Sequence, residues 1–198
     1  MTIDEEADGG GPDGQEVTVR EATPGDAEAV AAAHVAAVER FGPTAYDDEQ
    51  VAAWAERPDG AAPYRENARA DDEVFVVADR AGEVVGFGHL RPPAAREAPV
   101  PDDGPGARSN DEGEVTAVYV HGDHASGGVG SALLAHLEAA ARERGLDSLV
   151  LTASLNAVEF YERHGYERVR EGVHETTGGV ELEVVVMRRR LDAGTATE

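Results

Sequence analysis

The sequence VYVHGDHASGGVGSALL, residues 118–134, decides the fold, because a strand pattern leads through a glycine-rich turn into a helix. The turn ends near Gly130, and the segment 129–144 places its apolar side chains on one helical face. Such a turn leaves backbone N–H groups unpaired at the positive end of the helix dipole, where they bind phosphate without a cationic side chain. The stretch therefore predicts a phosphate-bearing ligand, although a tight turn without any ligand has the same pattern.

The turn differs from two common phosphate-binding motifs. No Gly-Lys-Ser/Thr sequence follows it, so it is not a Walker loop. Ala132 or Leu133 stands where the third glycine of a Gly-x-Gly-x-x-Gly motif would be. The turn alone therefore does not identify the ligand.

A second informative stretch is TASLNAVEFYERHGYE, residues 152–167. Asn156 and Glu159 form an Asn-x-x-Glu pattern, so one interpretation is that Asn156 caps the following helix. Tyr161 has an equally simple interpretation as an aromatic residue of the core. Both residues nevertheless remain candidates for a functional role.

Apolar periodicity and turn residues predict the other elements. We expect strands at 17–20, 74–79, 83–90, 114–120, 148–153, 167–173 and 182–191. We expect helices at 27–40, 48–56, 129–144 and 156–164. This order predicts an α/β fold with a single mixed sheet of about seven strands flanked by four helices, without an internal repeat.

The length of 198 residues suits one domain. We assign that domain to residues 16–191. Residues 1–15 have the composition of a disordered acidic tail, and residues 192–198 that of a second disordered tail. The segment 91–113 is rich in proline, glycine and charge, and we interpret it as a long mobile loop between two neighbouring strands.

The charge of the chain is strongly negative: 40 acidic residues oppose 17 basic ones, all of them arginine, for a formal net charge of −23. Such a surface repels nucleic acids and anionic membranes. At molar salt the Debye length falls to about 3 Å, and the self-repulsion is largely screened. We therefore expect a protein adapted to high internal salt, resembling those of halophilic archaea. An acidic mesophilic protein is the alternative, but it does not explain the missing lysines.

Several classes of site and location are excluded by composition. The chain has no cysteine, so disulfides, thiolate metal ligands and cysteine nucleophiles are absent. No apolar run has the ~18–20 residues of a membrane span, and the acidic N-terminus lacks a signal-peptide pattern. We expect a cytoplasmic protein.

The histidines do not predict a metal site. His121 and His124 flank the glycine turn with Asp123 between them, but these three residues do not define a zinc site, and we expect no metal. The other histidines are scattered, which fits core or surface positions: His34, His89, His136, His164 and His174.

Taken together, the two stretches resemble the GCN5-related N-acetyltransferase (GNAT) family. Residues 118–134 resemble its strand, turn and pyrophosphate loop, and residues 156–166 resemble its Asn-Ala-x-x-Phe-Tyr-x-x-x-Gly-Phe segment. The opening VREATPGDA at 19–27, the helix region around Trp54 and the last strand at 184–191 extend the resemblance over nearly the whole chain. The resemblance implies a mostly antiparallel, twisted sheet and the use of acetyl-CoA.

The glycine turn departs from the family pattern at four positions: Gly122, Ala125, Ser126 and Gly127. Gly122 replaces a proline, and Ala125 replaces an arginine or glutamine. Gly128 and Gly130 are retained. We therefore expect backbone amides, rather than cations, to hold the pyrophosphate.

The resemblance also implies roles for individual residues. The strand residues Val118, Tyr119 and Val120 would lie along the pantetheine, and Asn156 would hydrogen-bond to it. The pyrophosphate would be held by Ala125, Ser126, Gly127, Gly128, Val129, Gly130 and Ser131. Tyr161 matches the tyrosine that protonates the leaving thiolate. A phenol has a reference pKa of ~10 against ~8.5 for a thiol, so it keeps its proton at neutral pH.

The base that takes the amine proton is predicted less directly. Glu114 shares strand parity with Val118 and Val120, although a bulge would break that parity. Four residues at ~3.3 Å each place Glu114 about 13 Å along the strand from Val118, so a relayed water is an equal alternative. Glu114 could equally be a solvated carboxylate at the start of the strand.

These implications predict an N-acetyltransferase that moves an acetyl group from acetyl-CoA to a primary amine, by direct attack. The acceptor would be a small molecule or a peptide, and the protein could form a homodimer. The alternative is a non-catalytic acyl-CoA-binding or sensing module on the same fold. Tyr161 favours the enzyme, because a binding module needs no acid.

Overall fold

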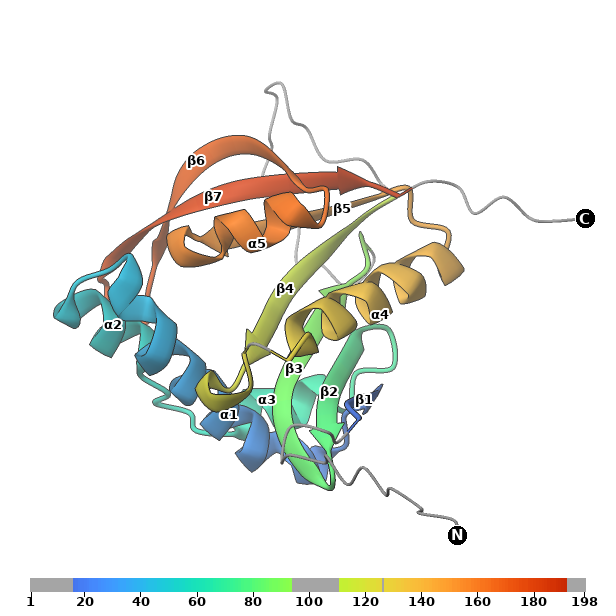
Figure 1. Cartoon of the computed structure of the whole chain (residues 1–198), viewed down its shortest axis with the longest axis horizontal. Helices are drawn as coiled ribbons and strands as arrows, with labels where there is room; N and C mark the ends of the chain where they lie inside the picture. Colours follow the sequence, from blue (N-terminus) through green and yellow to red (C-terminus); the bar gives the residue numbers. More distant parts are fainter. Residues whose placement is uncertain (1–15, 94–110, 126, 192–198) are drawn as a thin grey trace, which may run out of the picture.

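Seven strands form one twisted sheet in the order β1-β2-β3-β4-β5-β7-β6 (Figure 1). The computed structural model describes residues 16–93, 111–125 and 127–191. The strands are β1 Thr18–Glu21, β2 Val74–Arg80, β3 Glu83–Arg91, β4 Glu112–Val120, β5 Ser148–Ser154, β6 Glu167–Glu175 and β7 Glu181–Arg190. Every neighbouring pair is antiparallel except β4 and β5, which are parallel. The predicted α/β fold with a mixed, mostly antiparallel sheet is therefore confirmed.

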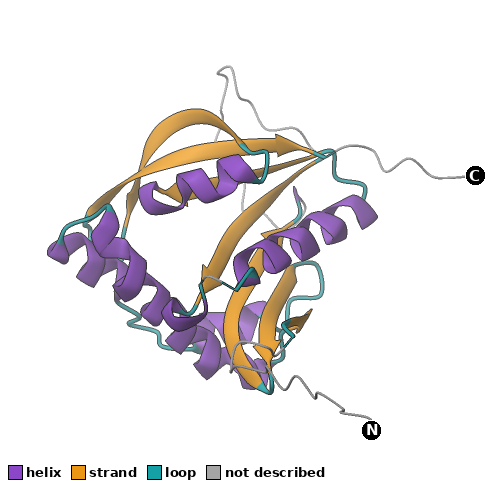
Figure 2. Cartoon of the chain, viewed as in Figure 1, coloured by secondary structure: helices purple, strands orange, loops and turns teal. Residues whose placement is uncertain are grey.

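Within the described residues, five α-helices lie on the two faces of the sheet (Figure 2). They are α1 Ala27–Phe41, α2 Asp48–Ala55, α3 Ala62–Asn67, α4 Val129–Glu143 and α5 Val158–Arg163. The sequence predicted four helices and missed α3, because Pro58 and Gly60 end the preceding helix and α3 is only six residues long. Pro63 lies in its first turn, where proline is tolerated, and Tyr64 anchors it in the core.

The alternation of side chains along β2 explains how both faces are covered. Val74, Val76 and Ala78 pack with α4 and α5 in one core cluster. Phe75 and Val77 point to the opposite face and pack with residues of α1 and α3. Strand β2 is therefore buried on both faces, which matches its continuous apolar sequence.

Strands β4 and β5 pair only at one end. The parallel ladder joins Glu112–Val115 to Ser148–Leu151 and then stops, although both strands continue. On the other side of β4, the register with β3 shifts between His89 and Leu90, so that Thr116 is an extra, bulged residue. Beyond this bulge β4 stays paired with β3 but diverges from β5, which leaves a gap between β4 and β5.

The predicted segments at the ends and in the long loop are only partly described. Strand β3 extends to Arg91 and β4 begins at Glu112, so both strands reach into the predicted loop 91–113. Residues 94–110 of that loop, and the predicted tails 1–15 and 192–198, lie outside the described residues. Among the helices that are described, none is long and apolar enough to span a membrane.

Candidate active site

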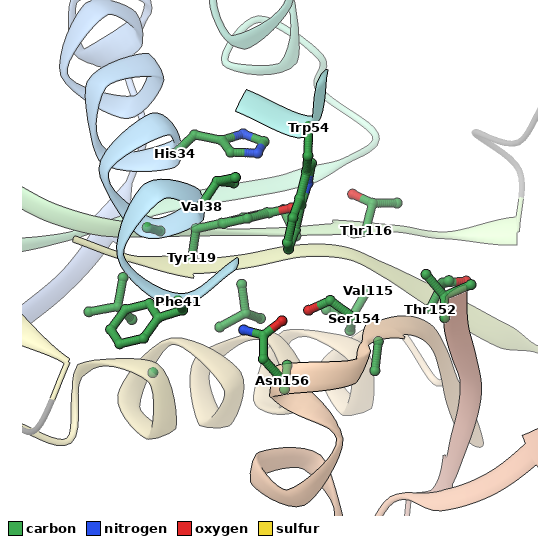
Figure 3. Close-up of a pocket in the computed structure, with 18 of the residues that line it drawn as sticks. His34, Val38, Phe41, Trp54, Val115, Thr116, Tyr119, Thr152, Ser154 and Asn156 are labelled. Atoms are coloured by element: carbon green, nitrogen blue, oxygen red, sulfur yellow. The ribbon is translucent and has the colours of Figure 1, made fainter. Parts of the chain in front are cut away.

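A cavity of about 910 Å³ occupies the gap between β4 and β5 and extends towards α1, α2 and α5. Seven of the ten aromatic residues of the chain line it, from a total of four Phe, five Tyr and one Trp. Figure 3 shows side chains converging on this cavity from both sides of the β4 ribbon, with Tyr119, Trp54 and Thr116 above it and Ser154 and Asn156 below. Because a chain with so few aromatics concentrates them here, the cavity is the strongest candidate for a functional site.

The glycine turn, residues 121–130, forms one end of the cavity. Gly128 precedes α4 with a φ of 74°, a left-handed conformation that favours glycine. The first bond of the helix runs from the N–H of Ala132 to the carbonyl of Gly128 (3.0 Å), so the amides of Val129, Gly130 and Ser131 precede the helical ladder.

Several predicted residues of the turn reach the cavity and others do not. Ala125, Gly128, Gly130 and Ser131 line it, whereas Val129 is fully buried in the core. The Ser131 hydroxyl lies 3.0 Å from Nε2 of His164, the residue after α5, which ties the start of α4 to the end of that helix. Ser126 lies outside the described residues.

One of the departures from the family pattern, Gly122, has a steric reason, and a second, Gly127, lies against the end of a flexible side chain. A Cβ atom at Gly122 would lie 2.8 Å from the Arg40 side chain of α1, and one at Gly127 would lie 2.8 Å from Nη2 of Arg80. Arg80 also contacts Nδ1 of His124 (3.1 Å). A cation from the end of β2 therefore lies beside the glycine turn. The sequence did not predict it, since Arg80 is more than 40 residues away and belongs to no motif.

Strand β4 presents a free backbone edge to the cavity. Val118, Tyr119 and Val120 line the cavity and pair with β3 on one side only, because the ladder with β5 ends at Val115. Alternate N–H and C=O groups beyond the bulge can therefore pair with an extended ligand as if it were a neighbouring strand.

Asn156 and Tyr161 also line the cavity. The capping interpretation of Asn156 is wrong, because the residue lies inside the 3-10 turn Leu155–Ala157 and Ala157 precedes α5. Tyr161 is only 7% exposed, and among the described residues its hydroxyl has no hydrogen-bond partner. Burial raises the pKa of Tyr161 above its usual value, so the phenol holds its proton at neutral pH.

The cavity also has an aromatic wall, which we define as His34, Tyr46, Trp54, Arg57, Tyr64 and Tyr119. The rings of His34 and Tyr119 lie 4.0 Å apart, and Tyr119 stacks on Phe87. Nδ1 of His34 lies 2.6 Å from the Tyr64 hydroxyl, and Nε2 of His34 contacts Arg57. Burial, together with the charge of Arg57, lowers the pKa of His34 to about 3, so this histidine is neutral.

Two hydrogen-bonding residues hold the wall in place. The Arg57 guanidinium donates to the Tyr64 hydroxyl (3.1 Å) and to the carbonyl of Trp54 (2.9 Å). The Tyr46 hydroxyl donates to the carbonyl of Glu183 on β7 (2.6 Å) and accepts from the amide of Leu155 (2.9 Å). The sequence did not predict the wall, because its residues come from four separate segments.

Glu114 lines the cavity and is half-buried. The bulge at Thr116 lies between Glu114 and Val118, so it breaks the strand parity that the sequence suggested. The position of Glu114 in the cavity therefore does not follow from simple alternation.

Nδ1 of His121 lies 3.9 Å from Oδ2 of Asp123, and the centroids of the His121 and His124 rings lie 5.8 Å apart. Within the described parts of the chain, no group of three or more His, Asp or Glu side chains is arranged to hold a metal ion.

Comparisons with known proteins agree with this geometry. The sequence model of the Acetyltransferase (GNAT) family matches residues 37–166. The uncharacterized N-acetyltransferase YjcF of Bacillus subtilis is 37% identical over 59 residues, which cover 30% of this chain and 42% of that protein. This match therefore spans less than half the length of the relative.

Two solved structures are similar over most of the chain. A GCN5-related N-acetyltransferase from Rhodopseudomonas palustris has 30% identity and a TM-score of 0.72, covering 88% of this chain and 95% of its own. The PaiA N-acetyltransferase of Thermoplasma acidophilum, solved in complex with coenzyme A, has 16% identity and a TM-score of 0.65, covering 88% and 99%. The family match spans well over half of the sequence and coincides with the cavity, the glycine turn and the split strands, and the chain therefore belongs to the GNAT acetyltransferase family.

Proposed function

We propose that the protein transfers an acetyl group from acetyl-CoA to a primary amine, by direct attack of the amine on the thioester. The observation that carries the proposal is the buried Tyr161, which lines the cavity and whose hydroxyl has no hydrogen-bond partner among the described residues. A protein that only binds acyl-CoA has no need of an unpaired acid in its binding cavity. The coenzyme A bound to the Thermoplasma neighbour supports the same cofactor.

The acetyl-CoA would lie in the gap between β4 and β5. Its pantetheine would pair with the free edge of β4 at Val118 and Val120, and Asn156 would contact it from α5's side of the gap. The pyrophosphate would accept hydrogen bonds from the amides between Ala125 and Ser131. This placement uses the cavity, the edge and the turn together.

The amine would enter between the aromatic wall and β4. Attack on the thioester carbon forms the amide, and Tyr161 would give its proton to the leaving thiolate. Glu114 lines the same cavity, and directly or through a water it is one candidate for the base. The acceptor would be a small molecule or a peptide amine.

The replacement Tyr161→Phe tests this proposal. We expect it to preserve coenzyme A binding in calorimetry and to lower kcat by about 10²-fold or more, because general acid catalysis contributes ~10²–10⁴-fold. Tyr166→Phe is the matched control: Tyr166 lies in the buried core five residues on and does not line the cavity. Unchanged turnover in Tyr161→Phe would remove Tyr161 from the mechanism.

The alternative is an acyl-CoA sensor on the same fold. Coenzyme A binding with no turnover against a panel of amines, amino acids and peptide N-termini would support it. The assays should be run at high salt, because we also propose that this acidic chain works in a cytoplasm of high ionic strength. The net charge of −23 and the absence of lysine support that environment, and argue against nucleic acid as a partner. A homodimer remains part of the proposal.

A further inference from the structure

A chain of three hydrogen-bonded side chains leads from the core to the cavity at the β4 bulge. Thr116 Oγ1 lies 2.8 Å from Nδ1 of His89, and Nε2 of the same ring lies 2.6 Å from Oε2 of Glu73. His89 is only 3% exposed, whereas Thr116 is exposed and lines the cavity. The middle of the chain is therefore buried, one end carries the charge of the half-buried Glu73, and the other end faces the site.

The direction of each hydrogen bond follows from the chemistry of the groups. A carboxylate only accepts, so Nε2 of His89 carries the proton that is donated to Glu73. Arg91 donates to the second oxygen of Glu73 (3.1 Å), which holds the carboxylate in place. Nδ1 of His89 is then an acceptor and takes the hydrogen bond of the Thr116 hydroxyl. The lone pairs of Thr116 Oγ1 are left to accept a hydrogen bond from a group in the cavity.

The position of Thr116 suits a group that meets the amine. It precedes Val118 by two residues, about 7 Å along a strand, against about 13 Å for Glu114. Figure 3 shows Thr116 on the same side of β4 as Tyr119 and Trp54, the side from which the acceptor would enter. The bulge is what places this hydroxyl in the cavity and within reach of the His89 ring.

We propose that Glu73, His89 and Thr116 form a proton relay, in which Thr116 accepts the proton of the attacking amine and passes its own proton to His89. This inference rests on the proposed acetyl transfer and replaces Glu114 as the route of the amine proton. Thr116 is the catalytic residue of the relay, and His89 and Glu73 are positioning residues that act through it.

The step conserves atoms and charge. The amine nitrogen bonds to the thioester carbon and its proton moves to Thr116 Oγ1, while the hydroxyl proton of Thr116 moves to Nδ1 of His89. The carbon–sulfur bond breaks and sulfur takes the proton of Tyr161. The imidazolium is stabilised by the Glu73 carboxylate. Its extra proton then returns through water to the Tyr161 phenolate, and both residues regain their starting states.

The resting charge of His89 fits this role. Burial lowers the pKa of His89, and the neutral ring is the form that can accept a proton. Among the described residues, the charged groups that act on the ring are Glu73, which favours the imidazolium, and Arg91, which opposes it. The carboxylate therefore stabilises the charge that appears on the ring during the reaction.

The replacement Thr116→Val tests the relay, because valine keeps the shape of threonine and removes only the hydroxyl. With acetyl-CoA and an active amine, we expect kcat to fall about 10²-fold or more while coenzyme A affinity and melting temperature stay close to wild type. Thr116→Ser should retain most of the turnover. Thr18→Val, the same change at an exposed position of strand β1 that does not line the cavity, should behave as wild type.

The pH profile separates a relay from a structural role. Wild-type kcat should fall as the pH drops through the pKa of His89, because a protonated ring cannot accept. Thr116→Val should lose this acid limb. Glu73→Gln should lower kcat, because the glutamine amide can donate to Nε2 and turn the ring to the tautomer that cannot accept from Thr116.

Three results would overturn the relay. Wild-type turnover by Thr116→Val would overturn the relay but not the proposed acetyl transfer. An unchanged acid limb of the pH profile in both Thr116→Val and Glu73→Gln would have the same consequence. Equal losses in Thr116→Ser and Thr116→Val would show that shape rather than the hydroxyl matters. A wild-type protein that acetylates no amine at any pH would overturn the proposed function and the relay together.

Discussion

The glycine turn and the aromatic wall, which both border the cavity, present different chemical groups to it. On the glycine turn, Ala125, Gly128 and Gly130 offer almost no side chain, so the surface there is mainly backbone. The aromatic wall is made of large side chains held by hydrogen bonds, among them Trp54 and Arg57. A backbone surface recognises what every acyl-CoA shares, whereas a wall of side chains can differ from one protein to the next. The difference predicts that substitutions on the two sides change the binding of different ligands.

Among the substitutions that compare the wall with the turn, we expect the largest change in ligand binding from Arg57→Leu on the wall. The change removes the bonds to Tyr64, His34 and the Trp54 carbonyl, and hydrogen bonds of charged groups contribute about 1.5–3 kcal/mol each. We expect the KM for the amine to rise at least about tenfold, with the Kd of coenzyme A unchanged, as measured by steady-state kinetics and calorimetry. Arg65→Leu, an arginine of α3 that does not line the cavity, is the control.

If Arg57→Leu weakened coenzyme A binding as much as it raised the KM for the amine, the proposed division between the wall and the turn would be wrong. Such a result would mean that the wall and the turn are one surface with respect to binding, and that the division between them is only one of composition.

A smaller effect is expected beside the turn, from Arg80→Gln. Arg80 lies against Gly127 and His124 but does not line the cavity, so its charge would act on the pyrophosphate at a distance. We expect the Kd of coenzyme A to rise about threefold to tenfold at low salt and less at high salt, because such interactions are screened. Arg69→Gln removes the same charge at an exposed position away from the turn. Equal changes in the two variants would mean that Arg80 acts only through net charge.

The smallest effect is expected from adding a cation to the turn, with Ala125→Arg. Arginine suits pyrophosphate because its guanidinium can donate two parallel hydrogen bonds. We expect coenzyme A to bind a few-fold more tightly at low salt, in the same titration, with Ala125→Gln as the uncharged control. No gain at low salt would argue that the pyrophosphate lies elsewhere.

The sequence predicted the elements of the fold well, because strands and helices are set by local periodicity. Strand β4 and helix α4 both begin and end within two residues of the expected bounds. Helix α3 was missed, since a six-residue helix has too few turns to show a period. The bulge at Thr116 was considered but not located, because the extra residue exists only relative to the partner strand β3.

In the candidate site, too, residues within local motifs were predicted, whereas residues brought together only by the fold were not. The residues predicted to bind the cofactor or to act as the acid lie in two motifs, and nine of them line the cavity: Val118, Tyr119, Val120, Ala125, Gly128, Gly130, Ser131, Asn156 and Tyr161. Arg80, His89 and the aromatic wall belong to no motif and come together only through the sheet. Residues that meet across strands or between helices leave no local signal in one sequence, so the position of Arg80 beside the turn was not predicted.

The bulge in β4 makes Thr116 a residue that the ladder with β3 does not use. Ala117 lies opposite His89 and Val115 lies opposite Leu90, so a deletion of Thr116 would leave these pairs in register and their side chains on the same faces. The buried Glu112 would keep its partner Arg188. Deletion of Thr116 should therefore preserve the fold of the strand and remove its hydroxyl from the cavity, so the folding of β4 and the chemistry of the site can be separated at this residue.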